Sequence, residues 1–351
     1  MTTLPSILLL LPDDYPRNML PAYGAKHSLT PSIDQLAQRG AVFENAYTTS
    51  PLCTPSRYSI LTGTYASSAP LNSRSRGGGV RPIKFNVWLQ GQANATIAGQ
   101  LRRKGFTTGF LGKWHVASSE ASEASGEPSQ REQQEMVRRE GGFDYADDVY
   151  FANPSLDRYA HNPEWMAFLA VRFMRNAMKL RDSPFFLYFA PTLPHEPLNN
   201  IVEQLQRTPR AGPPEEAHTL HSLRQTEEED FIRDAQALRV DVTAALVRSS
   251  ILCASGGDSA NVSLCPSKRL PKLSTLLGGA PWLPTDLSVR EVALVMSGAA
   301  WLDASLKSVF WEAQASTAAS AGAGGLLIIF TSDHGPGSFV GQHVASVLTR
   351  P

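Results

Sequence analysis

Four short runs of mainly apolar residues are the feature that most limits how this 351-residue chain can fold. Each run has five or six residues and ends abruptly at residues that favour turns. Runs of this length suit strands that are buried on both faces, as in a parallel sheet covered by helices. The four runs span residues 7–11, 107–111, 185–190 and 326–330. They predict an α/β fold with a mostly parallel central sheet.

Helical patterns alternate with these runs, as an α/β fold requires. One predicted helix has Thr30 as its N-cap, Pro31 at its first position and Gly40 as its stop. Three further helices are predicted from Pro163 to about Leu180, from the capping box of Thr226 and Glu229, and from Ser288 with Glu291. The sequence therefore predicts helices on both faces of the sheet.

Three stretches rich in polar or small residues interrupt this alternation, and we interpret them as insertions. They are residues 117–139, 207–225 and 249–285. A low-complexity segment of Ala, Gly and Ser, residues 313–325, is predicted to be a linker before the last strand.

The charge balance excludes some broad classes of function. Lys+Arg and Asp+Glu each number 32, so the formal net charge is zero. This argues against a general nucleic-acid-binding protein and against a polybasic membrane-surface protein. No apolar run approaches the roughly 18 residues of a membrane helix, so no transmembrane segment is expected. The short apolar run at the N-terminus follows no Lys or Arg and is not predicted to be a secretory signal.

Reactive polar side chains follow each of the four predicted strands. They are Asp13, Asp14, Lys113, His115, His195, Asp333 and His334. Because the carboxyl ends of parallel strands meet at one edge of a sheet, where ligands bind, we expect these side chains to lie together. Each motif also has an ordinary alternative, since Asp is common in turns and a loop histidine needs no function. The histidines at 27, 161, 218 and 221 match no motif and are predicted to be surface residues.

The segment Cys53-Thr54-Pro55-Ser56-Arg57, followed by Leu61-Thr62-Gly63, is the sharpest motif in the chain. Pro55 suits the first turn of a helix and Gly63 its end, which places Cys53 at a helix N-terminus. There the helix dipole and free N–H groups favour an anion, and Arg57 adds a permanent cation. These residues predict an activated thiol or an anion pocket, and the alternative is a small buried cysteine beside a surface arginine.

The Cys53 segment resembles the C-x-P-S-R signature of the formylglycine-dependent sulfatases, which have an arylsulfatase-like fold of the alkaline phosphatase superfamily. Other clusters resemble the remaining site motifs of that family in the same order: Asp13-Asp14, Gly112-Lys113-Trp114-His115, Pro194-His195 and Thr331-Ser332-Asp333-His334-Gly335. The resemblance implies that a formylglycine-generating enzyme oxidises Cys53 to an aldehyde, whose hydrate is the nucleophile.

A metal site is also implied by the resemblance. Its ligands would be Asp13, Asp14, Cys53, Asp333 and His334, with Ca²⁺ as the metal and Mg²⁺ as the alternative. Two adjacent carboxylates after one strand and a third after another are oxygen ligands of the kind that these hard cations prefer.

Four further side chains receive catalytic roles from the resemblance. Arg57 and Lys113 would neutralise sulfate oxygens together with the metal. His195 would assist the departure of the alcohol, and His115 would remove a proton from the hydrate as sulfate leaves. Lys113 and His115 lie two residues apart, so on an extended segment both side chains would point the same way.

The end of the chain departs from the family pattern. Family members commonly have a second active-site lysine shortly after the D-H-G motif, followed by a small C-terminal domain. Here the last lysine is Lys307, and the chain ends at Pro351. We therefore expect residues 1–351 to form an N-terminal catalytic domain without the C-terminal small domain, and to turn over substrate more slowly than a longer chain.

Three functions remain open from the sequence. The first is a sulfatase that acts on a small-molecule or carbohydrate sulfate ester. The second is a phosphonate or phosphate ester hydrolase that uses the same aldehyde. The third is a catalytically impaired protein that only binds anionic ligands. The resemblance suggests a secretory, lysosomal, extracellular or periplasmic location, and the leaving alcohol is not predicted because specificity resides on loops.

Overall fold

The structure is a computed structural model. The described residues are 4–25, 29–69, 89, 92–116, 129–150, 161–181, 183–195, 198, 201–209, 225–249, 289–318, 324–335 and 346–349. Most of the predicted insertions at 207–225 and 249–285 lie outside these residues, as does residue 288.

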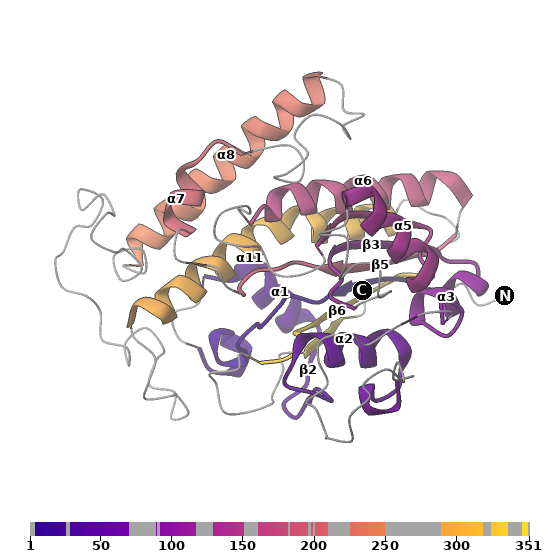
Figure 1. Cartoon of the computed structure of the whole chain (residues 1–351). Coiled ribbons are helices and arrows are strands. Elements are labelled where there is room, and N and C mark those ends of the chain that lie inside the picture. The colour runs from indigo at the N-terminus through magenta and orange to yellow at the C-terminus, as the bar shows by residue number, and fades with distance from the viewer. Residues whose placement is uncertain are drawn as a thin grey trace.

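A seven-stranded sheet forms the centre of the described structure, with strand order β2-β7-β6-β1-β5-β3-β4 (Figure 1). The strands are β1 (Ser6–Leu10), β2 (Ala41–Val42), β3 (Thr107–Lys113), β4 (Tyr145–Tyr150), β5 (Phe185–Ala190), β6 (Leu326–Thr331) and β7 (Ser346–Thr349). Strands β6, β1, β5, β3 and β4 are parallel, whereas β7 runs antiparallel to both β6 and β2. The predicted α/β fold and all four predicted strands are confirmed.

Alternate residues of the central strands face two separate hydrophobic cores. Leu8 and Leu10 belong to one core, while Leu9 and Leu11 belong to the other. The first core contains residues of α1 (Pro31–Arg39), α6 (Pro163–Arg181) and α11 (Val289–Ala318). The second contains residues of α2 (Cys53–Thr62), α3 (Ile97–Arg103) and α5 (Gln130–Gly141). Helices therefore cover both faces of the sheet, as predicted.

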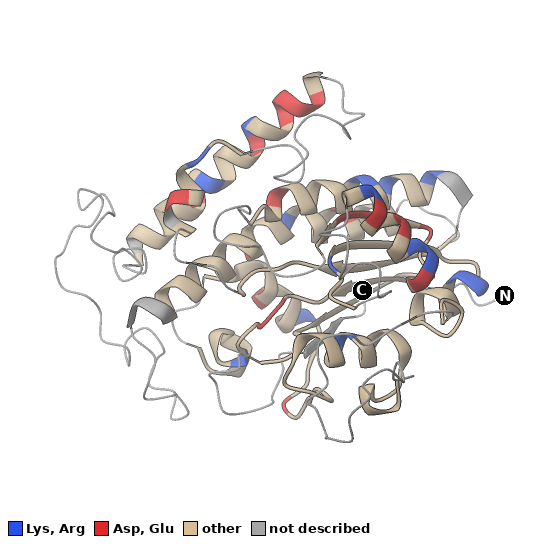
Figure 2. Ribbon diagram, in the orientation of Figure 1, with Lys and Arg blue, Asp and Glu red and all other residues tan. Residues whose placement is uncertain are grey.

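An outer layer covers the first core. It consists of α7 (Ile201–Gln206) and α8 (Gln225–Arg248), and α8 packs over α11 (Figure 1). Three short 3-10 helices, η1 (Arg17–Met19), η2 (Pro21–Tyr23) and η3 (Ala66–Ser68), complete the described elements. Both acidic and basic residues occur along α8 and α5 (Figure 2), and the acidic residues of α8 are concentrated near its N-terminus.

Several predicted boundaries need correction. Helix α8 begins at Gln225, so Thr226 lies within the helix rather than before it. Helix α11 continues to Ala318, into the segment predicted to be a linker, because its alanines favour the helix. Helix α5 occupies much of the predicted insertion at 117–139 and starts with a capping box of Ser129 and Glu132. Its Gln, Glu and Arg residues are polar but are also good helix formers.

Helix α1 begins where predicted, but its cap is different. The hydroxyl of Thr30 donates to the carboxylate of Asp34, 3.3 Å away, and makes no capping bond. The carboxylate of Asp303 on α11 instead accepts the backbone N–H groups of Ser32 and Ile33 at 3.0 and 2.8 Å. The start of α1 is thus fixed by a residue some 270 positions away in sequence.

One helix in the described part of the chain is long and apolar enough to cross a membrane by length and composition. It lies within α11 and spans Val292–Ala318, but 78% of its most apolar window is buried inside the protein. Burial of this extent is that of a core helix, and we do not interpret the segment as a membrane span.

Candidate active site

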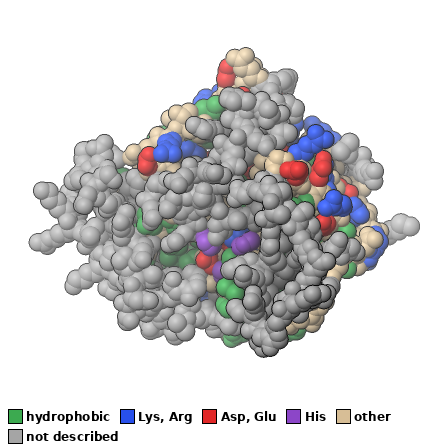
Figure 3. All heavy atoms as spheres, in the orientation of Figure 1, with side chains coloured by type: hydrophobic (Ala, Val, Ile, Leu, Met, Phe, Trp, Pro, Cys, Tyr) green, Lys and Arg blue, Asp and Glu red, His purple; other side chains and the backbone are tan. Residues whose placement is uncertain are grey.

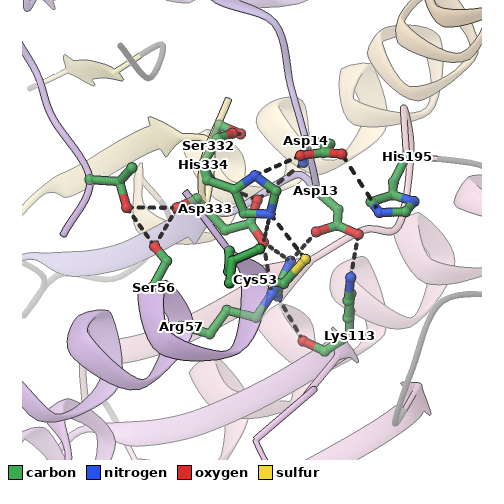
Figure 4. A network of polar contacts seen from close by, with 12 residues as sticks. Asp13, Asp14, Cys53, Ser56, Arg57, Lys113, His195, Ser332, Asp333 and His334 are labelled. Carbon is green, nitrogen blue, oxygen red and sulfur yellow. Dashed lines mark hydrogen bonds and ion pairs between the residues drawn. The ribbon is translucent and has the colours of Figure 1, made fainter. Parts of the chain in front are cut away.

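All nine side chains that the sequence singles out meet at the carboxyl ends of the parallel strands, and Figure 4 labels each of them except His115. Asp13 and Asp14 follow β1, Lys113 ends β3, His195 follows β5, and Asp333 and His334 follow β6. Cys53 and Arg57 come from α2, and His115 contacts Cys53. In the space-filling view, histidine, acidic and basic side chains lie beside one another in a hollow of this face (Figure 3).

Arg57 links the carboxyl ends of β1, β3 and β6. Its guanidinium is fully buried and donates to Asp13 Oδ1 at 3.1 Å, to Asp333 Oδ2 at 3.0 Å and to the backbone carbonyl of Lys113 at 2.9 Å. A surface arginine, the alternative considered from the sequence, is therefore wrong. The described contacts also direct Arg57 toward the carboxylates rather than toward an open anion pocket.

Lys113 is the second buried cation, and its Nζ lies 2.5 Å from Asp13 Oδ2. Gly112 places it there, because it adopts a φ of 99° and packs against β5. A Cβ atom at Gly112 would lie 2.1 Å from the carbonyl oxygen of Ala190. Only glycine fits this close approach, so the residue before Lys113 is fixed by the packing of the two strands.

The two buried carboxylates differ in their electrostatics. Burial alone would raise the pKa of Asp13, but the charges of Lys113 and Arg57 hold it well below its usual range. Burial and the nearby charge of Asp13 raise the pKa of Asp333 to about 7, although Arg57 opposes this. Two carboxylates this close to each other create a demand for additional positive charge at the site.

Cys53 occupies the first position of α2, as the sequence predicts. The preceding residue, Leu52, is the N-cap of α2, and its side chain makes no capping hydrogen bond to the helix. Burial would raise the pKa of the Cys53 thiol, but hydrogen bonds from His115, His195 and His334 lower it to about 3. The sulfur is therefore held as a thiolate among three imidazoles.

Each histidine has a different environment. Burial lowers the pKa of His115, whose backbone has a φ of 51°. The chain therefore turns after β3 rather than continuing in the expected extended form, yet Lys113 and His115 both reach the site. His195 Nε2 lies 3.6 Å from Asp14 Oδ2 at the more exposed side of the cluster.

His334 links Asp14 to Cys53. Its Nδ1 lies 2.6 Å from Asp14 Oδ1, and its Nε2 lies 3.0 Å from Cys53 Sγ. Burial would lower the pKa of His334, but these hydrogen bonds and the charge of Asp333 raise it to about 11. The charged imidazole thus supplies positive charge between the carboxylates and the thiolate.

Sequence reasoning missed two hydroxyl residues that position Asp333. Ser56 and Thr48 both donate to the backbone carbonyl of Asp333, Thr48 at 3.1 Å. Ser56 belongs to the Cys53 motif, so its place in that motif was the available signal, whereas its burial beside Arg57 is seen only in the structure. The serine therefore ties α2 to the segment after β6.

His161 was also misjudged, because the sequence predicts a surface residue. It is 2% exposed, and its Nδ1 lies 2.8 Å from Thr192 Oγ1. The other histidines that match no motif, at 27, 218 and 221, lie outside the described residues.

Four of the five predicted metal ligands form a compact group. Donor atoms of Asp13, Cys53, Asp333 and His334 all lie within 4.8 Å of one another. Asp14 lies beside this group, against His334 and His195. The carboxylate oxygens of this group fit a hard divalent cation.

Sequence comparison finds sulfatases among known proteins. The chain is 36% identical to human Arylsulfatase D over 120 residues, which are 34% of this chain and 20% of that protein. It is 38% identical to the N-acetylgalactosamine-6-O-sulfatase of Bacteroides thetaiotaomicron over 112 residues, 32% of this chain and 20% of that protein. It is 30% identical to human Arylsulfatase A over 225 residues, 55% of this chain and 42% of that protein. The matched region thus spans between 20% and 42% of these relatives.

Solved structures share the fold. A Bacteroides thetaiotaomicron protein, described in work on the metabolism of multiple glycosaminoglycans, superposes with a TM-score of 0.61 at 17% identity and covers 99% of this chain and 67% of its own. The Phosphonate Monoester Hydrolase of Agrobacterium radiobacter superposes with a TM-score of 0.50 at 21% identity and covers 98% of this chain and 68% of its own. The profile of the family named Sulfatase matches residues 5–346. The chain belongs to the sulfatase family.

Proposed function

We propose that this protein is a sulfuric ester hydrolase, which cleaves a sulfate monoester to an alcohol and sulfate with a nucleophile made from Cys53. The observation that carries the proposal is the position of Cys53. It lies at the first position of α2, in contact with three imidazoles and within the group of metal-binding side chains. In a member of the sulfatase family, this is where a nucleophile is needed.

Asp13, Asp333, His334 and the oxygen derived from Cys53 would hold the cation, with Asp14 beside them. His334 would bind as the neutral imidazole, because the cation would replace the proton on its ligating nitrogen. A bound Ca²⁺ or Mg²⁺ would withdraw charge from the sulfate oxygens and lower the barrier to attack at sulfur. Arg57 and Lys113 keep the carboxylates in place, because each cation is buried and contacts Asp13 directly. We therefore assign to Arg57 the positioning of ligands rather than a direct contact with sulfate.

Oxidation of Cys53 to formylglycine would supply an aldehyde hydrate with two hydroxyl groups, one to attack sulfur and one to expel sulfate afterwards. His115 suits the second step, since burial lowers its pKa and keeps its imidazole neutral and able to accept a proton next to residue 53. His195 suits the first, since it lies at the open side of the site, where Asp14 stabilises the charged imidazolium that protonates the leaving alcohol.

Mass spectrometry tests the modification directly. The protein is co-expressed with a formylglycine-generating enzyme, and the tryptic peptide Gly40–Arg57 is analysed. We expect the Cys53 thiol to be replaced by an aldehyde. A peptide that carries only free Cys53 would contradict the covalent mechanism and favour a protein that merely binds anionic ligands.

The substrate class is best approached through the relatives. One relative is an N-acetylgalactosamine-6-O-sulfatase, and one solved structure of the same fold contains its substrate D-glucosamine-2-N,6-O-disulfate. Two human relatives are arylsulfatases. We propose a small-molecule or carbohydrate sulfate ester, and rates on an aryl sulfate, a 6-O-sulfated hexosamine and a simple alkyl sulfate would rank these alternatives.

A phosphonate or phosphate ester hydrolase is the second candidate, because a phosphonate monoester hydrolase has the same fold. Parallel rates on an aryl sulfate and the matching aryl phosphate and phosphonate separate the two. We expect the sulfate to be hydrolysed faster. A faster rate on either phosphorus ester would assign the protein to the second class.

A further inference from the structure

A second buried polar network lies behind the loop that carries His195. It consists of His161, Thr192, Gln204, Glu164 and Arg239, which we call the His161 network. All five residues are at most 5% exposed. None of them belongs to a motif that the sequence analysis singled out. The network joins the helical layer of α7 and α8 to the end of β5.

Thr192 is the member that contacts the His195 loop. Its backbone carbonyl accepts the N–H of His195 at 2.9 Å, which closes the turn after β5. The preceding residue, Pro191, accepts the N–H of Asp13 at 3.2 Å. A shift of Thr192 would therefore displace the His195 imidazole, and the same segment also contacts the backbone of a predicted metal ligand.

His161 fixes Thr192 through its side chain. Its Nδ1 lies 2.8 Å from the hydroxyl oxygen of Thr192. The backbone N–H of His161 donates to Gln204 Oε1 at 3.0 Å, so both the ring and the backbone of His161 are anchored. These two hydrogen bonds fix the position of the imidazole that contacts Thr192.

The rest of the network gives His161 a rigid support. Arg239 Nη1 donates to the backbone carbonyl of Gln204 at 3.0 Å, and Arg239 Nε lies 2.7 Å from Glu164 Oε1. Trp301 donates its indole N–H to the same oxygen at 2.6 Å, and its ring lies 4.9 Å from the Arg239 guanidinium carbon. The buried charges are balanced one to one, so this part of the network has no need of a ligand.

We propose that His161 is a positioning residue, which acts through Thr192 to hold His195 in place for protonation of the leaving alcohol. The proposal rests on the proposed function, since it assigns a step of that reaction to His195. Supporting residues that orient catalytic groups commonly change activity by about 10- to 100-fold when removed. An effect confined to the transition state lowers kcat and leaves KM nearly unchanged.

Four variants test the route from His161 to His195: His161→Ala, Thr192→Val, Thr192→Ser and the double variant His161→Ala with Thr192→Val. We expect the first two to lower kcat on an aryl sulfate by about 10- to 100-fold, with KM within about twofold of wild type. Thr192→Ser keeps the hydroxyl and should keep kcat. The double variant should be no slower than either single variant, because the two residues act as one unit.

Ser6→Ala is the matched control for loss of stability. The Ser6 hydroxyl is buried and accepts the N–H of Phe185 at 3.1 Å, at the opposite end of the same strand β5. This variant should lower the melting temperature about as much as Thr192→Val and leave kcat unchanged. If kcat fell in proportion to the melting temperature in all variants, including Ser6→Ala, the role of His161 would be structural only.

A second measurement separates this proposal from the proposed function. The Hε1 NMR signal of His195 is assigned in histidine-labelled protein by its absence in His195→Gln. We expect the signal to move in His161→Ala and Thr192→Val and to stay in Ser6→Ala and Thr192→Ser. If the protein hydrolysed no ester but showed these shifts, the proposed function would be wrong, whereas the positioning of His195 through Thr192 would still hold. An unmoved signal in Thr192→Val, or kcat losses that multiply in the double variant, would overturn the proposal.

Discussion

Two buried aspartates of this protein have similar electrostatics and different tasks. Asp303 on α11 and Asp333 after β6 are both almost fully buried, and burial raises the pKa of each to about 7. Asp303 contacts the backbone N–H groups of Ser32 and Ile33 at the start of α1. Asp333 contacts Arg57 and lies among a second carboxylate, an imidazole and a thiol.

The difference shows that a perturbed pKa does not by itself mark a functional site. The carboxylate of Asp303 accepts two backbone N–H groups of α1, and this role in the fold accounts for its burial without a ligand. Asp333 also accepts backbone N–H groups, from Asp14 at 3.1 Å and His334 at 2.9 Å. It differs from Asp303 because its donor atoms lie within 4.8 Å of those of a second carboxylate, an imidazole and a cysteine sulfur. A site is indicated where reactive groups of different kinds gather.

The first prediction concerns Cys53, which has no counterpart near Asp303. Cys53→Ala removes the group from which the nucleophile is made, so kcat/KM on an aryl sulfate should fall by at least about 10⁴-fold. Turnover of an aryl sulfate by the purified variant checks this.

Ser59→Ala is the control on the same helix. The Ser59 hydroxyl donates to the backbone carbonyl of Pro55 at 3.0 Å and lies nearly two turns along α2 from Cys53. Its loss should leave turnover unchanged. A Cys53→Ala variant as active as Ser59→Ala would remove Cys53 from the mechanism.

Much of the fold follows from the sequence, because the central strands are buried on both faces and read as apolar runs. The runs at 185–190 and 326–330 agree with β5 and β6 to within one residue. Strand β4 was missed because it lies at the sheet edge and contains Asp147 and Asp148. Strands β2 and β7 are too short for an alternation to be visible.

The members of the site were predictable, but their arrangement was not. Parallel strands bring their carboxyl ends to one edge, so Asp13, Lys113 and Asp333 had to be neighbours. Nothing in the sequence shows that Arg57 lies beneath the carboxylates, or that Thr48 and His161 support the site. These contacts join residues far apart in sequence, so they form only when the helices pack onto the sheet.

The second prediction compares the two aspartates directly. Asp333→Asn should weaken Ca²⁺ binding by at least about 100-fold, since it removes a predicted ligand rather than a residue that orients one. In wild type, Ca²⁺ at 100 times its dissociation constant should stabilise the fold by about 2.7 kcal/mol. At the same Ca²⁺ concentration this stabilisation should fall to about 0.4 kcal/mol or less in Asp333→Asn and persist in Asp303→Asn, as measured by melting temperature and calorimetry. Equal responses to Ca²⁺ in both variants would show that the metal does not bind at Asp333.

The third prediction tests the strand that positions Lys113 against Asp13. Gly112→Ala forces a Cβ atom against the carbonyl of Ala190 and strains the backbone at a φ of 99°. We expect a loss of about 2 to 4 kcal/mol in the free energy of unfolding, because a clash is added to the strain, and about tenfold slower turnover.

Gly105→Ala separates strain from clash. Gly105 has a φ of 90°, but a Cβ atom there would meet nothing within 4 Å. This variant should lose only about 1 to 2 kcal/mol and keep its activity. If both variants behaved alike, the close contact between β3 and β5 would not control the position of Lys113.

The last prediction concerns the pH dependence of stability at Asp303, where no loss of activity is expected. An aspartate in the unfolded chain has a pKa of about 3.9, whereas burial raises the folded pKa of Asp303 to about 7. Between these values the folded state binds more protons than the unfolded state, so stability must fall as the pH rises from about 4 to about 7. The contribution of Asp303 is therefore fully present below about pH 4 and lost above about pH 7.

Asp303→Asn removes this titration and leaves one oxygen to accept an N–H of α1. Between pH 4 and pH 7 the free energy of unfolding should fall less in the variant than in wild type. The two decreases should differ by at most about 4 kcal/mol. Asp148, whose pKa burial raises to about 8, adds a slope of the same sign to both proteins, so the difference between them isolates Asp303. Urea unfolding of both proteins at several pH values provides the measurement. Parallel stability curves would mean that Asp303 ionises as readily in the folded chain as in the unfolded one, and the comparison with Asp333 would then rest on geometry alone.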